Sequence, residues 1–157
     1  MMTDKSAGAV SVLNSPGTRS KKEIEAMTKL KIPPNCDVTY GFNLVEKEPG
    51  RTVWEWIPDE RWENPAGVVQ GGSVSAFADT TMASTVVTAL DGRKALVFTA
   101  EAKVSYLRAI KSGVRLTCEG VIVQIGNRLA FAEATVRDPE ERAVAKASST
   151  WVISERA

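Results

Sequence analysis

Residues 64–90, with the sequence NPAGVVQGGSVSAFADTTMASTVVTAL, decide the fold of this protein. From Ser73 to Leu90 the apolar residues recur at spacings of three and four, which predicts a helix of about five turns, roughly 27 Å long. Apart from Asp79, the other faces of this segment also carry small or apolar residues. A helix that is apolar nearly all round is a buried one. We therefore expect a long central helix that the rest of the chain covers.

The segments on either side of this helix alternate apolar and polar residues, which is typical of strands. Before the helix, residues 38–47 and 52–57 flank a Glu-Pro-Gly turn and predict a hairpin. After it come three or four strand-like segments, joined by a Gly126-Asn127 hairpin turn and by a turn at 138–141. These segments are 95–106, 114–125, 128–137 and 142–153. The helix is the only element able to cover one face of such a sheet, so the sequence predicts an α+β fold.

The N-terminal part of the chain differs from the rest. Residues 1–19 are rich in Ser, Ala, Gly and Thr without periodicity, so we expect a flexible leader. Ser20 and Glu23 have the spacing of a capping box, which predicts a short helix over residues 21–31 that a Pro-Pro pair ends. Nothing in the remainder suggests a linker, and residues 20–157 are expected to form one domain.

The bulk composition is ordinary for a soluble globular protein. The chain has 157 residues, of which 43% are hydrophobic and 25% charged, and this length fits one substantial core. Its net charge of +1 gives no global field to attract nucleic acid or an anionic membrane. No segment approaches the length of a membrane span, and no signal-peptide-like apolar run follows the N-terminus. Cys36 and Cys118 are far apart and fit buried thiols in a reducing compartment. We expect a cytoplasmic protein without nucleic-acid or membrane partners.

The sequence contains no histidine. This excludes Ser-His-Asp and Cys-His catalysis in their usual forms and removes the commonest zinc ligand, so we expect neither a metal centre nor a cofactor. Asp79 stands out, because an ionised carboxylate within an apolar helix is costly to bury unless it is paired or used in catalysis. A residue that is hydrogen-bonded to a neighbouring strand, or that faces solvent, would fit the same pattern.

The start of the long helix is the second candidate feature. The first amides of a helix have no internal acceptor, and Gly71 and Gly72 let a ligand or another backbone approach closely. Together they favour a developing negative charge at this point, so the Gly71 amide could serve as an oxyanion donor. Tight packing alone would also explain the Gly-Gly pair.

The motif Asn64-Pro-x-Gly-x-x-Gln-Gly-Gly, followed by Asp79, resembles the signature of hotdog-fold thioesterases of the phenylacetate-degradation and hydroxybenzoyl-CoA type. The resemblance continues through residues 97–101 and 105–108 to the final strand, and covers roughly residues 38–153. It implies the hotdog fold, a curved antiparallel β-sheet wrapped around a long central helix.

The resemblance also implies roles for single residues. Asp79 matches the helical carboxylate of the family, which acts as general base on water or as nucleophile, and Gly71 matches its oxyanion amide. Asn64 matches a side-chain amide that orients the carboxylate or the thioester, and Thr99 a hydroxyl that positions the water. Gln70 stands where the family often has a histidine, and because an amide cannot titrate, proton transfer by that group is absent here.

A further departure from the family is Ala109, which replaces a common proline. The family fold implies an active site at a dimer interface, where Asp79 of one subunit meets the helix start of the other. A homodimer is then the minimal unit, and the expected assembly is a homotetramer. Cations are expected where coenzyme A phosphates bind, although solvated turn charges would fit each cation equally well. The candidate substrate or CoA contacts are Gly72, Arg108, Lys111, Arg128 and Trp62, whereas Trp54 and Trp56 share one strand face and are expected in the core.

These features favour an acyl-CoA thioesterase that hydrolyses a small or medium acyl-CoA, aromatic acyl groups included, to the free acid and CoA. Hydratases of the same fold normally rely on a histidine, so the sequence argues against that activity. The alternative is a non-catalytic hotdog protein that binds acyl-CoA or an aromatic ligand without turnover.

Overall fold

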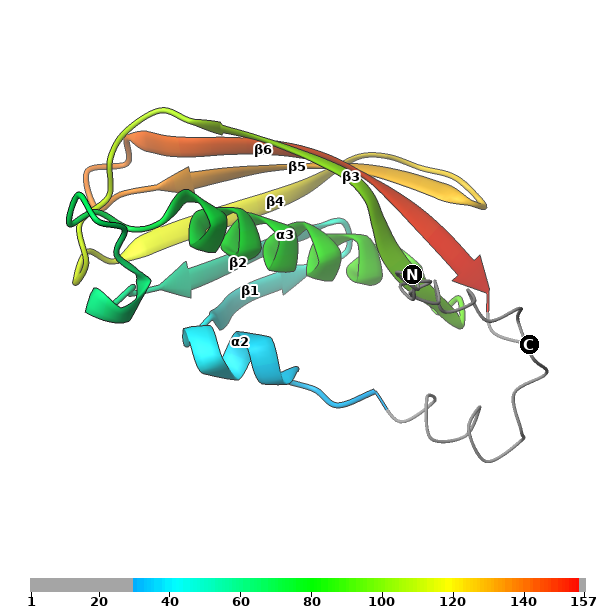
Figure 1. Cartoon of the computed structure of the whole chain (residues 1–157). Helices are drawn as coiled ribbons and strands as arrows, with labels where there is room; N and C mark the ends of the chain where they lie inside the picture. Colours follow the sequence, from blue (N-terminus) through cyan, green and yellow to red (C-terminus); the bar gives the residue numbers. More distant parts are fainter. Residues whose placement is uncertain (1–29, 156–157) are drawn as a thin grey trace, which may run out of the picture. The chain divides into compact units, whose positions relative to one another are not determined.

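A computed structural model of the chain describes residues 30–155 (Figure 1). Internal contacts divide the chain into the units Met1–Ile32 and Pro33–Ala157, and every named element belongs to the second. The elements are α2 (Asn35–Tyr40), β1 (Asn43–Glu48), β2 (Arg51–Trp56), the 3-10 helix η1 (Glu60–Trp62), α3 (Gly71–Thr88), β3 (Ala95–Tyr106), β4 (Leu116–Ile125), β5 (Leu129–Arg137) and β6 (Ala143–Glu155). The predicted leader and capping box lie outside the described residues, and Leu30 and Lys31, at the end of the predicted first helix, are not helical.

The six strands form one sheet in the order β1-β2-β4-β5-β6-β3, and all neighbours are antiparallel. The sheet curves over α3, which lies along its inner face (Figure 1). This confirms the predicted α+β arrangement of a curved antiparallel sheet around one long helix. Strand β3 follows α3 in the chain but pairs only with β6, at the edge of the sheet.

The core lies between α3 and the inner face of the sheet. Phe77, Met82 and Val86 on α3 are all 0% exposed, and Leu116 on β4 meets the same core at 0%. Burying each such side chain contributes roughly 1.5–3 kcal/mol, so this face of the helix holds it firmly against the sheet.

A buried hydroxyl cluster lies between α3 and strands β2 and β4. The Thr85 hydroxyl is 2.7 Å from that of Thr52 and donates to the Thr81 carbonyl at 2.8 Å. Gly120 of β4 lies directly against this cluster, and a Cβ there would be 2.4 Å from the Thr85 hydroxyl oxygen. The glycine therefore allows the helix to approach the sheet this closely.

The strand predicted over residues 38–47 is wrong in its first half, because the helix α2 occupies it and β1 begins after that helix. Gly41 ends α2 in the left-handed conformation, with φ 78°, and its amide donates to the Asp37 carbonyl at 2.9 Å. The Asp37 carboxylate is buried and accepts a hydrogen bond from Thr80 on α3 at 3.0 Å. The left-handed turn at Gly41 and the contact with α3 outweigh the local alternation that suggested a strand.

The other elements lie within a few residues of their predicted ranges. Strand β3 has the predicted bounds, and α3 begins at Gly71, two residues earlier than predicted, and ends at Thr88. Among residues 30–155, no helix is long and apolar enough to cross a membrane.

Candidate active site

Asp79 lies two turns inside α3, on the side of the helix that faces β3. The carboxylate is partly buried and accepts a hydrogen bond from the Thr99 hydroxyl on β3 at 3.0 Å. Burial raises the pKa of Asp79, because desolvation disfavours the charged form, and the bond from Thr99 lowers it part of the way back. The structure thus brings together two of the predicted site residues.

The start of α3 carries two amides without an acceptor. Gln70 is the N-cap and makes no side-chain capping bond. Within residues 30–155, neither the Gly71 nor the Gly72 amide has a hydrogen-bond acceptor. A cavity of about 300 Å³ opens beside Gly71, with Tyr106 and Arg108 in its lining. Free amides at the positive end of a helix dipole favour a negatively charged oxygen at this point.

Asn64 shapes the loop that leads into the helix. Its side-chain oxygen accepts from the Ala66 amide at 2.9 Å, and its backbone amide donates to the Val68 carbonyl at 2.8 Å. In the part of the chain that the structure describes, no hydrogen bond joins Asn64 to Asp79. The Asn64 side-chain oxygen thus contacts its own loop, and its role in orienting the carboxylate or the thioester stays a prediction.

Trp54 and Trp56 contact the core, as the alternation along β2 predicted. Trp56 is 1% exposed, and Trp54 packs against the core and donates from its indole nitrogen to the Ser84 hydroxyl at 2.7 Å. Trp62 is only partly buried and stacks on Tyr40, with 4.2 Å between ring centroids. Among the described residues, its indole nitrogen is the one buried side-chain polar atom without a hydrogen-bond partner.

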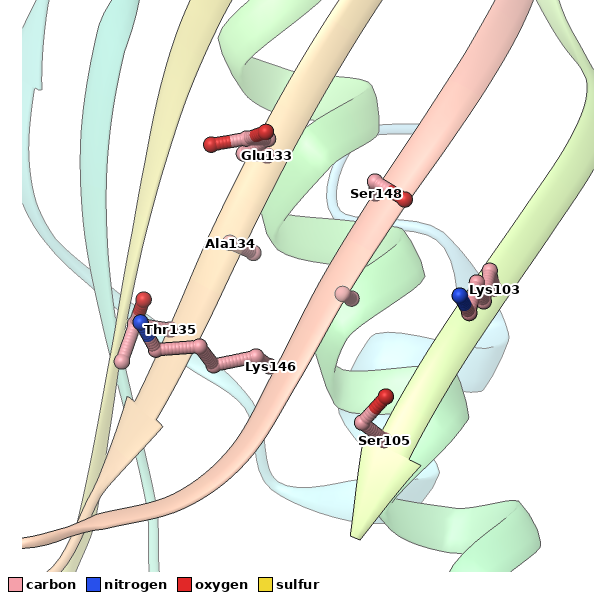
Figure 2. Close-up of a pocket in the computed structure, with 8 residues that line it drawn as sticks. Lys103, Ser105, Glu133, Ala134, Thr135, Lys146 and Ser148 are labelled. Carbon is pink, nitrogen blue, oxygen red and sulfur yellow. The ribbon is translucent and has the colours of Figure 1, made fainter.

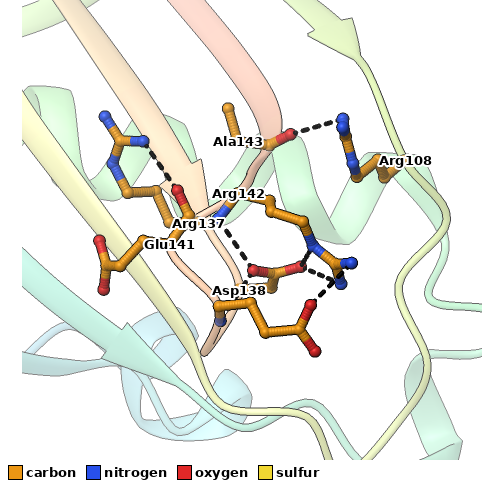
Figure 3. Close-up of polar contacts among 7 residues, drawn as sticks. Arg108, Arg137, Asp138, Glu141, Arg142 and Ala143 are labelled. Atoms are coloured by element: carbon orange, nitrogen blue, oxygen red, sulfur yellow. Dashed lines mark hydrogen bonds and ion pairs between the residues drawn. The ribbon is translucent and has the colours of Figure 1, made fainter.

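The predicted CoA-binding cations lie at two ends of the sheet. Arg108 follows β3 and contacts the Ala143 carbonyl at 3.4 Å, beside a turn in which Arg142 is already paired with Asp138 at 2.7 Å (Figure 3). Lys111 lies three residues further along and is exposed. Arg128 precedes β5, which runs parallel to β3, so it lies at the opposite end of the sheet. The three cations form no single cluster within one protomer.

Another hollow, of about 280 Å³, lies on the outer face of the sheet and has no part in this site. Figure 2 shows its polar lining, including Lys103, Glu133 and Lys146, on strands β3, β5 and β6, with α3 behind the sheet. Within the same described range, no group of three side chains suited to bind a metal ion occurs.

The sequence profile of the thioesterase superfamily matches residues 66–145 of this chain. This range includes the helix start, Asp79 and Thr99. No curated protein matches the sequence.

Several solved structures share the fold. The PaaI protein from the phenylacetic acid degradation operon of E. coli is 15% identical with a TM-score of 0.72, over 87% of this chain and 92% of that one. A Streptococcus mutans protein bound to acetyl-CoA is 21% identical with a TM-score of 0.69, over 83% and 98%. A putative esterase from Mycobacterium tuberculosis is 20% identical with a TM-score of 0.74, over 78% and 98%. These likenesses confirm the expected hotdog fold.

Proposed function

This chain belongs to the thioesterase superfamily, and on that premise we propose that it hydrolyses a small or medium acyl-CoA, aromatic acyl groups included, to the free acid and coenzyme A. The observation that carries the proposal is Asp79, a partly buried carboxylate held by one hydroxyl, that of Thr99. The raised pKa of Asp79 makes its ionised form a stronger proton acceptor than an ordinary surface carboxylate.

The proposed chemistry needs only this carboxylate and the free amides. Asp79 takes a proton from water as the water oxygen bonds to the thioester carbonyl carbon, and the amides of Gly71 and Gly72 stabilise the resulting oxyanion. Collapse breaks the carbon–sulfur bond, and the proton on Asp79 passes to the departing thiolate. If Asp79 instead attacks the carbon directly, the coenzyme A thiolate leaves and a mixed anhydride forms. Water then hydrolyses this anhydride to the free acid and the Asp79 carboxylate, and the released proton passes to the thiolate. Either route requires the ionised form of Asp79, and Gln70 contributes hydrogen bonds alone.

Two protomers supply this chemistry in the proposed assembly. Gly71 and Asp79 are eight residues apart on α3, a rise of about 12 Å along one helix. A thioester carbonyl must lie about 3 Å from its oxyanion donor and about 3–3.5 Å from the attacking water. Two copies of the helix running side by side in opposite directions meet both conditions more readily than one copy. Strand β3, at the sheet edge, is the element through which the two sheets would join.

Coenzyme A binding is proposed at the Gly71 end of the helix. Arg108 lines the cavity beside Gly71 and Lys111 is exposed three residues further along, which supports both cations as the proposed phosphate contacts. The Streptococcus mutans protein of the same fold binds acetyl-CoA. Arg128 lies at the opposite end of the sheet, so it contacts coenzyme A only if the Arg128 of a second protomer reaches this cavity. Trp62 is the proposed contact for the acyl group.

A tetramer is proposed as the larger assembly. The outer face of the sheet exposes a row of large apolar side chains, which monomeric proteins rarely leave in water. These are Phe98, Val121, Val123, Leu129, Phe131 and Val152, each between 38% and 60% exposed. Packing of two dimers through this face would bury them.

The function is tested by thiol release from a panel of short, medium and aromatic acyl-CoAs. We expect steady turnover by the wild type and a loss of about 10²–10⁴-fold in kcat for Asp79→Asn, which keeps the shape of the side chain but accepts no proton. Asp91→Asn is the matched control, because Asp91 is exposed and its φ of 49° suits asparagine. Tight binding of acyl-CoA without released thiol would indicate the binding protein instead.

The oxyanion amide is tested by comparing two variants at Gly71. Proline is well tolerated at the first position of a helix, so Gly71→Pro removes the N–H with little cost to α3. Gly71→Ala keeps the N–H, and each variant adds a Cβ about 3.1 Å from the Tyr106 ring. We expect Gly71→Pro to have a kcat about 10²–10³-fold below that of Gly71→Ala. Equal rates in the two variants would show that this amide plays no part.

A further inference from the structure

Two hydroxyls that the proposed chemistry does not use converge on the first turn of α3. The Tyr106 hydroxyl, at the end of β3, donates to the Gly71 carbonyl at 3.0 Å and lies 2.5 Å from the Ser75 hydroxyl. A carbonyl can only accept, so the Tyr106 proton goes to Gly71, and Ser75 must donate to Tyr106. A chain of two hydroxyls thus ends on the backbone of Gly71.

This contact adds little to the packing of the helix. Tyr106 is 54% exposed, whereas α3 is held by side chains such as Phe77 and Met82, which are 0% exposed. The Tyr106 ring nevertheless lies so close to Gly71 that a Cβ there would be 3.1 Å from the ring. The contact therefore acts on the first turn of the helix and not on its buried face.

The first turn of α3 begins with two glycines, Gly71 and Gly72. Helix ends fray, and two adjacent glycines leave the backbone unusually free to rotate. The Gly71 carbonyl and the Gly72 N–H belong to the same planar peptide group and point in opposite directions. The Tyr106 hydroxyl adds a second hydrogen bond to a carbonyl that also faces the helix ladder, and this further restricts the direction of the Gly72 amide.

We propose that Tyr106 and Ser75 are positioning residues, which hold the peptide between Gly71 and Gly72 so that the Gly72 amide points at the oxyanion beside the Gly71 amide. The inference rests on the proposed thioesterase function. Donors that are already aligned need no reorganisation as the negative charge develops, so their alignment lowers the barrier of the chemical step.

A β-bulge in β3 allows residues of this one strand to contact both Asp79 and the start of α3. Thr99 and Tyr106 are seven residues apart, and in a regular strand an odd spacing puts side chains on opposite faces. The pairing of β3 with β6 shifts by one residue between Thr99 and Glu101. After this shift, Tyr106 lies on the same face as Thr99, so that Thr99 meets Asp79 and Tyr106 meets Gly71.

The test is the kinetics of Tyr106→Phe and Ser75→Ala in the full-length protein. We expect kcat for acyl-CoA hydrolysis to fall about 10-fold in each, less than for removal of a whole oxyanion donor, because the amides remain but lose their alignment. KM should stay within about twofold, since ground-state binding is unchanged. The acid limb of the pH-rate profile should not move, because the bond between Thr99 and Asp79 is intact.

Two further variants separate positioning from a merely structural role. Ser75→Thr keeps the hydroxyl and should restore most of the kcat lost in Ser75→Ala. Ser105→Ala removes a hydroxyl from the neighbouring position of β3, on the outer face of the sheet, and should leave kcat unchanged.

An unchanged kcat in Tyr106→Phe overturns the inference. So does a variant in which only KM changes, or one in which the fall in kcat comes with a shift of the acid limb of the pH-rate profile. If the wild type turns over and Asp79→Asn does not, such a result leaves the proposed function standing. If the wild type releases no thiol from any acyl-CoA, the proposed function fails and this inference fails with it.

Discussion

At the scale of single residues, burial and one hydroxyl shift the pKa of the candidate base in opposite directions. Burial raises the pKa of Asp79 and the hydrogen bond from Thr99 lowers it. The proposed reaction needs the ionised carboxylate, so kcat/KM should fall as the pH drops through this raised pKa. In Thr99→Val the lowering bond is lost and the pKa rises further. We therefore expect the acid limb of the pH-rate profile to move to higher pH, with the largest loss of rate at low pH.

Thr99→Ser retains a hydroxyl at the same place, so the acid limb of its pH-rate profile should lie at the same pH as that of the wild type. If the acid limb of Thr99→Val does not move, or moves to lower pH, the Thr99 hydrogen bond does not lower the pKa of Asp79. The measurement is the pH dependence of kcat/KM for the wild type, Thr99→Val and Thr99→Ser under the same conditions.

The sequence predicted Asp79 and Thr99 as site residues, but not Tyr106 and Ser75, which we propose to position the start of α3. The periodicity of α3 and the absence of histidine isolated Asp79 as the acidic candidate, and the family resemblance suggested Thr99. The contact of Tyr106 with Ser75 depends on a β-bulge, because strand alternation alone places Tyr106 on the opposite face from Thr99. Tyr106 lies within residues 105–108, which share the family resemblance, but that resemblance gave it no role, and Ser75 is one of several hydroxyl residues on α3.

At the scale of elements, the distance between α3 and the sheet depends on Gly120. A Cβ at this position would lie 2.4 Å from the Thr85 hydroxyl oxygen. This hydroxyl cannot move away easily, because it is hydrogen-bonded to the Thr52 hydroxyl and to the Thr81 carbonyl. We expect Gly120→Ala to lower the free energy of unfolding by about 1–3 kcal/mol or more. Urea unfolding at a fixed protein concentration measures the change.

The control for this prediction is Gly126→Ala, where the nearest heavy atom would be 3.6 Å from the new Cβ. Its stability should stay within about 0.5 kcal/mol of the wild type. If the clash is the cause, Thr85→Ala should relieve it, and the double variant Gly120→Ala/Thr85→Ala should lose less stability than the sum of the single changes. An additive loss would rule out the direct contact.

The elements themselves differ in how far local sequence could predict them. Strand β3 and helix α3 have long periodic patterns, and their predicted ranges are correct to within two residues. Helix α2 was missed, because its position is fixed by the contact of Asp37 with Thr80, which is 43 residues away in the chain. Gly120 carried a readable signal, since a glycine inside a strand often marks a close approach by another element.

At the scale of the whole molecule, the proposal that each site draws on two protomers can be tested by complementation. Asp79→Asn removes the base and Gly71→Pro removes the amide, so each homodimer should be inactive. In a mixed dimer, one site combines the intact Asp79 of one protomer with the intact helix start of the other, and the second site lacks both. When the two variants are refolded together in equal amounts, half of the dimers are mixed, and roughly a quarter of the wild-type activity should return. If a single protomer supplied both groups, every site would remain defective in one of them, and mixing would restore nothing.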